Sequence, residues 1–148
     1  MHDMDWKITN LSSIFSQCNM TTGELVSMEA LARWQKSDGT FISPGEFIPL
    51  FESSGFITRF DMYIWKSVCK TLAAWRDKGC KLVPISINVS MIDITNIDVP
   101  QYLSMLTEQY HISPEYLPVE ITESVFAESN TIVKNTNLPR FHKKGFFT

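Results

Sequence analysis

Four side chains with oxygen donors lie inside otherwise apolar segments of this chain, and their types suit a metal-ion site. They are Glu29, Asn88, Glu120 and Glu123. An ionised carboxylate is costly to bury without a cation or a hydrogen-bond donor. Carboxylate and amide oxygens are ligands that hard cations such as Mg²⁺ and Mn²⁺ prefer. The residue types therefore favour one shared metal site, provided that the apolar segments are neighbouring strands.

Each of these residues also has an ordinary structural interpretation. A single glutamate in a strand, such as Glu29, is commonly paired with an arginine or a lysine. Asn88, which precedes Val-Ser, could end a strand in a turn, and Glu123 could lie on the surface. Residue type and spacing leave both interpretations open.

The apolar segments that must position these residues have the composition of strands. Runs rich in apolar and β-branched residues predict strands over 24–34, 82–89 and 117–122. The second run is dense enough in such residues to predict burial on both faces. A weaker run at 14–20 could form a short strand, and 145–148 has the pattern of the opening of a fourth.

Helical patterns occupy the intervals between these strands. Ser43 can cap a helix that has Pro44 at its first position, and 35–40 before it predicts a loop. Apolar residues spaced by four predict the longest helix over 58–78. Further helices are predicted at 98–110, 130–135 and 139–144. The alternation of strands and helices favours an α/β fold with a parallel sheet and right-handed crossovers.

Composition limits the classes of function. The chain has 148 residues, is 44% hydrophobic and carries a net charge of −3, which suits one ordinary domain and gives no general basic surface for nucleic acid. No run approaches the ~20 apolar residues of a membrane span, and the N-terminus lacks a signal-peptide pattern. Three cysteines without a CxxC spacing fit a reducing compartment. We therefore expect a cytoplasmic protein that binds neither nucleic acid nor membrane.

Several motifs resemble the EAL-domain family, bacterial phosphodiesterases that open cyclic di-GMP to linear pGpG. The motifs occur in the family's order: Glu29-Ala-Leu-Ala-Arg-Trp34, Pro44-Gly-Glu-Phe-Ile-Pro49, Glu52-Ser-Ser-Gly-Phe-Ile57, Ile87-Asn-Val-Ser90 and Glu120-Ile-Thr-Glu-Ser124. The resemblance covers 22–148 and leaves 1–21 as an N-terminal lead-in. It implies a TIM-type (β/α) barrel. Such a barrel usually needs about 250 residues, so we expect a partial barrel, roughly the N-terminal half.

The resemblance also implies roles for individual residues. Glu29, Asn88 and Glu120 would be ligands of Mg²⁺ or Mn²⁺ in a two-metal site. Leu31 and Arg33 would bind the substrate, cyclic di-GMP, with the Arg33 guanidinium approaching a phosphate. The metal ions would activate the phosphate and the attacking water.

The resemblance implies that Glu123 would support the loops around the metals. This sequence departs from the family's pattern at two places. The family carries a Gln-Pro pair where Phe15-Ser16 stands here. After Gly145 the family continues with a paired-aspartate strand and later with a lysine, a glutamate and a glutamine. None of these is present in the 148 residues. We therefore assign no catalytic residue and expect little or no hydrolysis by this C-terminally truncated form of the domain.

Two alternatives stay open beside the interpretation that the chain descends from a phosphodiesterase. The chain could be a non-catalytic binding or regulatory module that pairs with its own copy or with another EAL-domain chain. An unfinished parallel sheet would offer an open edge for such pairing. The chain could also be a gene remnant that folds poorly.

Overall fold

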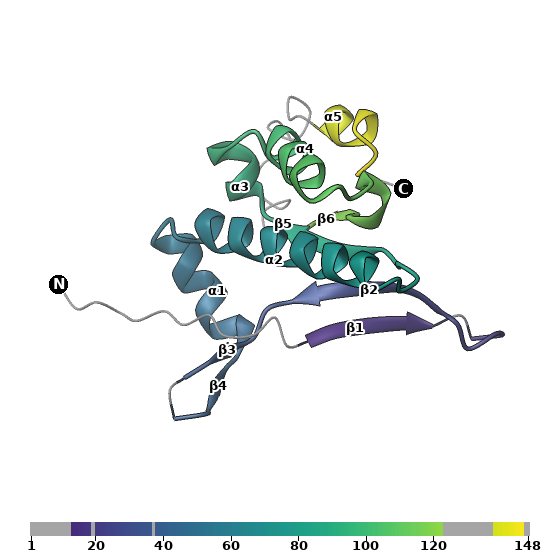
Figure 1. Cartoon of the computed structure of the whole chain (residues 1–148). Coiled ribbons are helices and arrows are strands. Elements are labelled where there is room, and N and C mark those ends of the chain that lie inside the picture. The colour runs from purple at the N-terminus through teal and green to yellow at the C-terminus, as the bar shows by residue number, and fades with distance from the viewer. Residues whose placement is uncertain (1–12, 19, 37, 123–137, 147–148) are drawn as a thin grey trace.

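The core of the molecule is a four-stranded sheet. The computed structural model describes residues 13–18, 20–36, 38–122 and 138–146. The strands are β1 (Ser13–Cys18), β2 (Leu25–Leu31), β5 (Ile85–Val89) and β6 (Val119–Ile121), in the order β1-β2-β5-β6. In Figure 1, β1 and β2 lie below α2 (Ile57–Asp77), and β5 and β6 lie in the middle of the view.

The strand directions confirm one part of the predicted parallel sheet and contradict another. β2, β5 and β6 are parallel, as the strand–helix alternation predicts. β1 runs antiparallel to β2, so the expectation of parallel strands is wrong for this pair. The reason is the short connection through Gly23, which has φ +67°, because only antiparallel neighbours can be joined without a crossover.

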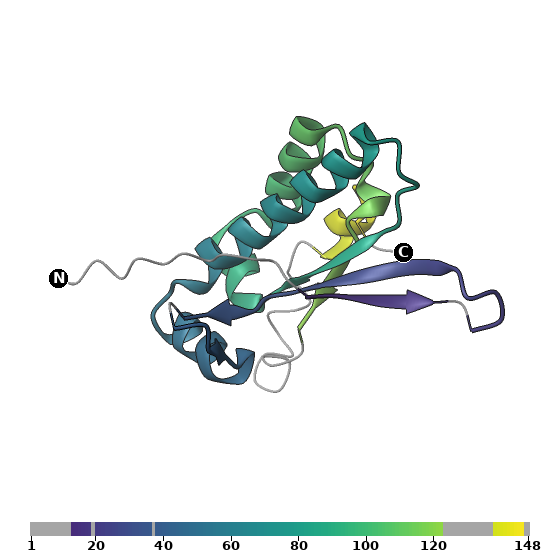
Figure 2. The same cartoon turned by 60° about the horizontal axis from the view of Figure 1, so that its bottom comes forward.

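Helices α2 and α4 pack on the same face of the sheet, as Figure 2 shows. The helices are α1 (Pro44–Ser53), α2 (Ile57–Asp77), α3 (Met91–Asn96), α4 (Val99–Tyr110) and α5 (Leu138–Lys143), with a 3₁₀ turn at Pro114–Tyr116. The predicted helices that correspond to α1, α2, α4 and α5 are confirmed, whereas the one predicted at 130–135 lies outside the described residues. In the described ranges, no helix is long and apolar enough to cross a membrane.

Alternation along β5 shows why the sheet has one open face. Ile85, Ile87 and Val89 are fully buried and pack on α2 and α4. Ser86 and Asn88, which point to the other face, are only half-buried. The prediction that this strand is buried on both faces is therefore wrong, because the described helices that reach the core cover one face only.

A small hairpin replaces the end of the first predicted strand. β2 ends at Leu31, and the chain then forms β3 (Trp34–Gln35) and β4 (Phe41–Ile42), which pair with each other. The Trp34 ring packs on the Phe47 and Phe51 rings of α1, with centroid distances of 5.8 and 5.7 Å. The loop predicted at 35–40 connects β3 to β4, except that Gln35 belongs to β3.

Arg76 ties the end of α2 to the end of α4, and this gives a first testable prediction. Its Nη1 donates to the carbonyl oxygens of Tyr110 and His111, at 2.7 Å each. These carbonyls lie at a helix C-terminus, where backbone acceptors lack helical donors and a cation is favourable. Because the Arg76 side chain is 37% exposed, we expect Arg76→Met to lower the free energy of unfolding by about 1–2 kcal/mol. Urea unfolding checks this, with exposed Lys70→Met as the control; equal losses in both variants would contradict it.

Candidate functional site

Strand register places the three predicted metal ligands on one face of the sheet. Glu29 lies beside Ser86, and Asn88 lies beside Glu120. Residues two apart on a strand share a face, so Glu29, Asn88 and Glu120 all lie opposite the face that packs on the helices. Adjacent strands are about 4.8 Å apart, which puts the Asn88 and Glu120 backbones at about that distance and the Glu29 backbone roughly 8 Å from Asn88.

None of the three predicted metal ligands is fully buried. Glu29 and Asn88 are half-buried and Glu120 is exposed. The cost of burying a carboxylate therefore applies to Glu29 only in part, because its side chain is half-buried on the open face of the sheet. Glu123 lies outside the described residues, so its supporting role stays a prediction.

The chemistry of this donor set fits a hard cation. Two carboxylates flank one amide oxygen on three adjacent strands, and all three side chains are accessible to solvent. In the part of the chain that the structure describes, no cluster of three or more His, Cys, Asp or Glu side chains could hold a metal ion by itself. The predicted set has two carboxylates, and its third oxygen is that of the Asn88 amide.

A hollow of about 100 Å³ adjoins this set at the carboxyl ends of β2 and β5. Its lining includes Leu31, Arg33, Asp61 and Asn88, so it brings the two residues predicted to bind substrate together with a predicted metal ligand. Within the described ranges the Arg33 guanidinium makes one hydrogen bond, from Nη1 to the Ala32 carbonyl at 3.2 Å. A guanidinium has five N–H donors, so four of them have no acceptor among the described residues.

Side chains of α2 fix the backbone beneath the site. Trp65 is fully buried, and its Nε1 donates to the carbonyl oxygen of Asn88 at 3.0 Å. At the last residue of α3, the Asn96 amide donates to the Thr58 hydroxyl at 3.2 Å. These bonds tie the end of β5 and the following helix to one face of α2.

Asp61 is a half-buried acid at the wall of the hollow. Burial raises the pKa of its carboxyl group to about 9, and the negative charges of Asp93 and Glu52 and a hydrogen bond with Asp93 act in the same direction. Asp93 itself is fully buried at the start of α3. A protonated Asp61 can donate a hydrogen bond at neutral pH, which an ordinary aspartate cannot.

The sequence interpretation missed Asp61, Trp65 and Asp93 as residues that support the site. Two signals were available. Ser90 and Asp93 have the spacing of a capping box directly after a strand, and the structure contains that box. Asp61 is a carboxylate in the apolar stripe of the longest helix, four residues before Trp65, where a polar residue needs a partner.

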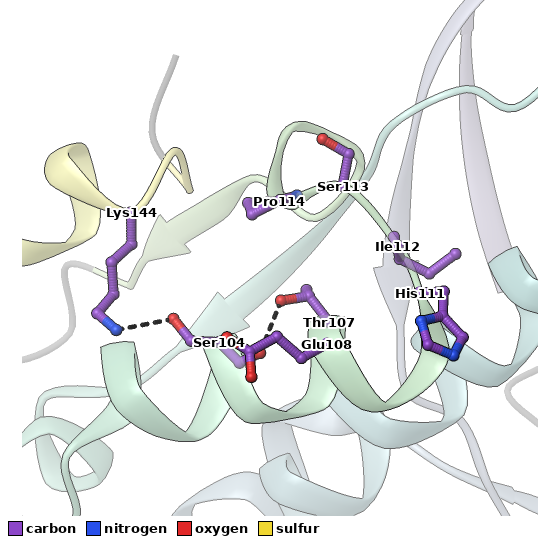
Figure 3. A pocket seen from close by; sticks show the side chains of 8 residues that line it. All are labelled: Ser104, Thr107, Glu108, His111, Ile112, Ser113, Pro114 and Lys144. Atoms are coloured by element: carbon purple, nitrogen blue, oxygen red, sulfur yellow. Dashed lines mark hydrogen bonds between the residues drawn. The ribbon is translucent and has the colours of Figure 1, made fainter.

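A larger hollow of about 780 Å³ lies at the other end of the sheet (Figure 3). Its eight lining residues run along α4 and the turn that leads into β6, and they end at Lys144, whose Nζ donates to the Ser104 hydroxyl at 3.0 Å. This connection precedes β6, so the hollow lies at the amino end of that strand. Parallel α/β folds carry their chemistry at the carboxyl ends. We therefore assign the candidate site to the smaller hollow.

Comparison with known proteins agrees with this architecture. The family model described as "EAL domain" matches residues 13–147. The probable cyclic di-GMP phosphodiesterase PdeB of Escherichia coli K12 is 33% identical over 113 residues, which cover 76% of this chain and 22% of PdeB. The chain thus spans about a fifth of the length of this relative.

Two solved structures have the same fold. The MucR phosphodiesterase in complex with c-di-GMP superposes with a TM-score of 0.69 at 21% identity, covering 89% of this chain and 54% of that one. The cGMP-bound EAL enzyme Bd1971 gives 0.75 at 23% identity, covering 90% and 38%. The predicted α/β fold, with strands that form part of a TIM-type barrel, is confirmed. The chain belongs to the EAL domain family.

Proposed function

We propose that the open face of β2, β5 and β6 is part of a site for cyclic di-GMP and a divalent cation. The observation that carries this proposal is the strand register, which sets Glu29, Asn88 and Glu120 on one face of three adjacent strands. Asn88 also lines the hollow that contains Arg33. The name of PdeB and the bound ligand of the MucR structure support cyclic di-GMP as the ligand. On this proposal, the ancestral activity is hydrolysis of cyclic di-GMP to pGpG.

Each residue has a distinct task in this proposal. Glu29, Asn88 and Glu120 would hold Mg²⁺ or Mn²⁺, which would neutralise charge on the phosphate and polarise it. Arg33 would donate two parallel hydrogen bonds to a phosphate, and Leu31 would contact the ligand from the hollow's apolar wall.

A cation titration tests the metal half of the proposal. Calorimetric titration of the 148-residue chain with Mn²⁺ is expected to show binding that Glu29→Ala weakens about tenfold or more, because one of three ligands is lost. Glu24→Ala is the matched control, since Glu24 is an exposed glutamate just before the same strand. Equal Mn²⁺ affinity in wild type and Glu29→Ala would reject the assignment.

Hydrolysis by the 148 residues alone is expected to be slow or absent. The family resemblance calls for a paired-aspartate strand, a lysine, a glutamate and a glutamine beyond the three ligands, and no Asp-Asp pair occurs in the sequence. Incubation with cyclic di-GMP and Mn²⁺, followed by chromatography for pGpG, checks this. Product that disappears in Glu29→Ala would contradict the expectation and would indicate that a second chain completes the site.

A second candidate is a binding module that pairs with its own copy or with another EAL-domain chain. The observation that favours it is the open sheet face, where Ser86 and Asn88 are half-buried and Glu120 is exposed. Sedimentation velocity across a hundredfold range of concentration tests it. A molecular mass that stays that of the monomer at every concentration would reject the hypothesis that the chain pairs with its own copy.

We also propose a cytoplasmic location. The two cysteines whose side chains the structure describes, buried Cys69 and exposed Cys80, are both free thiols. Free thiols are typical of a reducing compartment. Fractionation of a cell that expresses the protein tests this, and recovery outside the cytoplasmic fraction would contradict it.

A further inference from the structure

Three polar side chains on one side of α2 face the end of β5 and the helix that follows it. Thr58, Asp61 and Trp65 are spaced by three and four residues, so they lie on one side of the helix. Thr58 accepts from Asn96 at 3.2 Å, and Trp65 donates to the backbone beside the site at 3.0 Å. Asp61 lies between them in sequence and faces Asp93.

Only one of the two carboxylate oxygens of Asp93 accepts a hydrogen bond from the N-cap of its own helix. Its Oδ2 accepts from the Ser90 backbone N–H at 2.8 Å, while the Ser90 hydroxyl accepts from the Asp93 backbone N–H at 3.1 Å. Oδ1 is buried, and in the described ranges no conventional donor reaches it. A buried acceptor without a donor is costly, and so are two ionised carboxylates side by side.

One proton on Asp61 would remove both costs, because it gives Asp93 Oδ1 a donor and leaves only one of the two carboxyl groups ionised. We propose that Asp61 and Asp93 share one proton, which the Asp61 carboxyl donates to Asp93 Oδ1, and that this bond positions the junction between β5 and α3. Through Ser90 the bond holds the backbone two residues beyond Asn88, so its importance for the site rests on the proposed function. Asp61 and Asp93 are positioning residues; neither is assigned contact with the ligand.

The charged groups around Asp61 favour this arrangement. Glu52 of α1 and Asp93 of α3 are both acidic and disfavour a second negative charge. Arg33 is the basic residue of the same hollow's lining, but it is not among the groups that shift the pKa of Asp61. β5 contributes no titratable side chain (Ile85–Val89).

The direction of the pH dependence follows from the raised pKa of Asp61. Its folded-state pKa of about 9 exceeds the ordinary value of 3.8, so the stability it contributes is complete below about 3.8 and is lost as the pH rises towards 9. One linked proton changes the unfolding equilibrium constant by up to about tenfold per pH unit. Asp61→Asn keeps an N–H donor for Asp93 and has no proton to lose.

Urea unfolding between pH 5 and 9 tests the shared proton without any ligand. Wild type and the control Glu108→Gln, an exposed acid on α4, are expected to lose stability in parallel as the pH rises. Asp61→Asn should lack the part of this pH-dependent loss of stability that comes from ionisation of Asp61. The same pH-dependent loss in Asp61→Asn as in wild type would overturn the proposal.

The positioning role has its own readout. In ¹H–¹⁵N spectra at pH 7, the side-chain amide of Asn88 and the backbone amide of Ser90 should shift in Asp61→Ala and return towards their wild-type positions in Asp61→Asn. Unchanged Asn88 and Ser90 signals in a folded Asp61→Ala variant would overturn the positioning role of Asp61. If Asp61→Ala fails to fold, the spectrum of Asp61→Asn tests the positioning role by itself. Asn88 and Ser90 amide resonances far from those of wild type would then count against the proposal. Because no cation is present, failure here is distinct from failure of Mn²⁺ binding.

Discussion

Trp65→Ala is expected to lower the free energy of unfolding by about 3–5 kcal/mol, the largest effect of any single change considered. The indole is fully buried between the sheet and α4, where its ring lies 6.0 Å from the ring of Tyr102. Removing it leaves a cavity in the core. It also leaves the Asn88 carbonyl without the 3.0 Å bond that Nε1 donates. A loss of this size is a large share of the stability of a small domain.

Trp65→Phe separates the two causes. Phenylalanine keeps most of the apolar volume but has no N–H, so we expect a loss of about 1–3 kcal/mol from the unsatisfied carbonyl. Urea unfolding followed by far-UV circular dichroism measures both variants. Met105→Ala, a change at a half-exposed site on α4, is the control and should cost little. A Trp65→Ala loss no greater than that of Met105→Ala would show that Trp65 does not anchor the core.

Arg33→Ala is expected to weaken binding of cyclic di-GMP by about 10- to 100-fold. Hydrogen bonds from a charged donor contribute about 1.5–3 kcal/mol, and a guanidinium can make two of them to one phosphate. The Arg33 side chain lines the hollow and makes one bond in the described part of the chain, to a carbonyl oxygen. Among the described residues Arg33 has no ion pair that would have to break before its remaining donors meet a ligand.

Arg33→Lys keeps the charge but loses the paired donors, so its affinity should fall between those of wild type and Arg33→Ala. Arg59→Ala is the control, because Arg59 is exposed and its guanidinium lies 5.9 Å from the ring of Phe56, outside the lining of the hollow. Calorimetric titration with cyclic di-GMP in Mn²⁺ measures all four proteins. Equal loss in the Arg33 and Arg59 variants would mean that general charge, and not the position of Arg33, determines affinity.

The sequence by itself determined the family, most helices and the parallel strands of this protein. These features depend on local patterns. A capping residue followed by proline begins α1, apolar residues spaced by four give α2, and β-branched runs give β5. The motif residues Glu29, Asn88 and Glu120 were visible as donors because their types alone suit a cation.

Tertiary structure alone decided how these donors meet. Whether Glu29 shares a face with Asn88 depends on the pairing of β2 with β5, and a shift of one residue would turn one set of side chains to the other face. The antiparallel β1 and the half-burial of the site likewise depend on which segments pack together. Asp61 and Asp93 become partners only because α2 packs on α3. Such contacts join residues far apart in sequence, and no local periodicity records them.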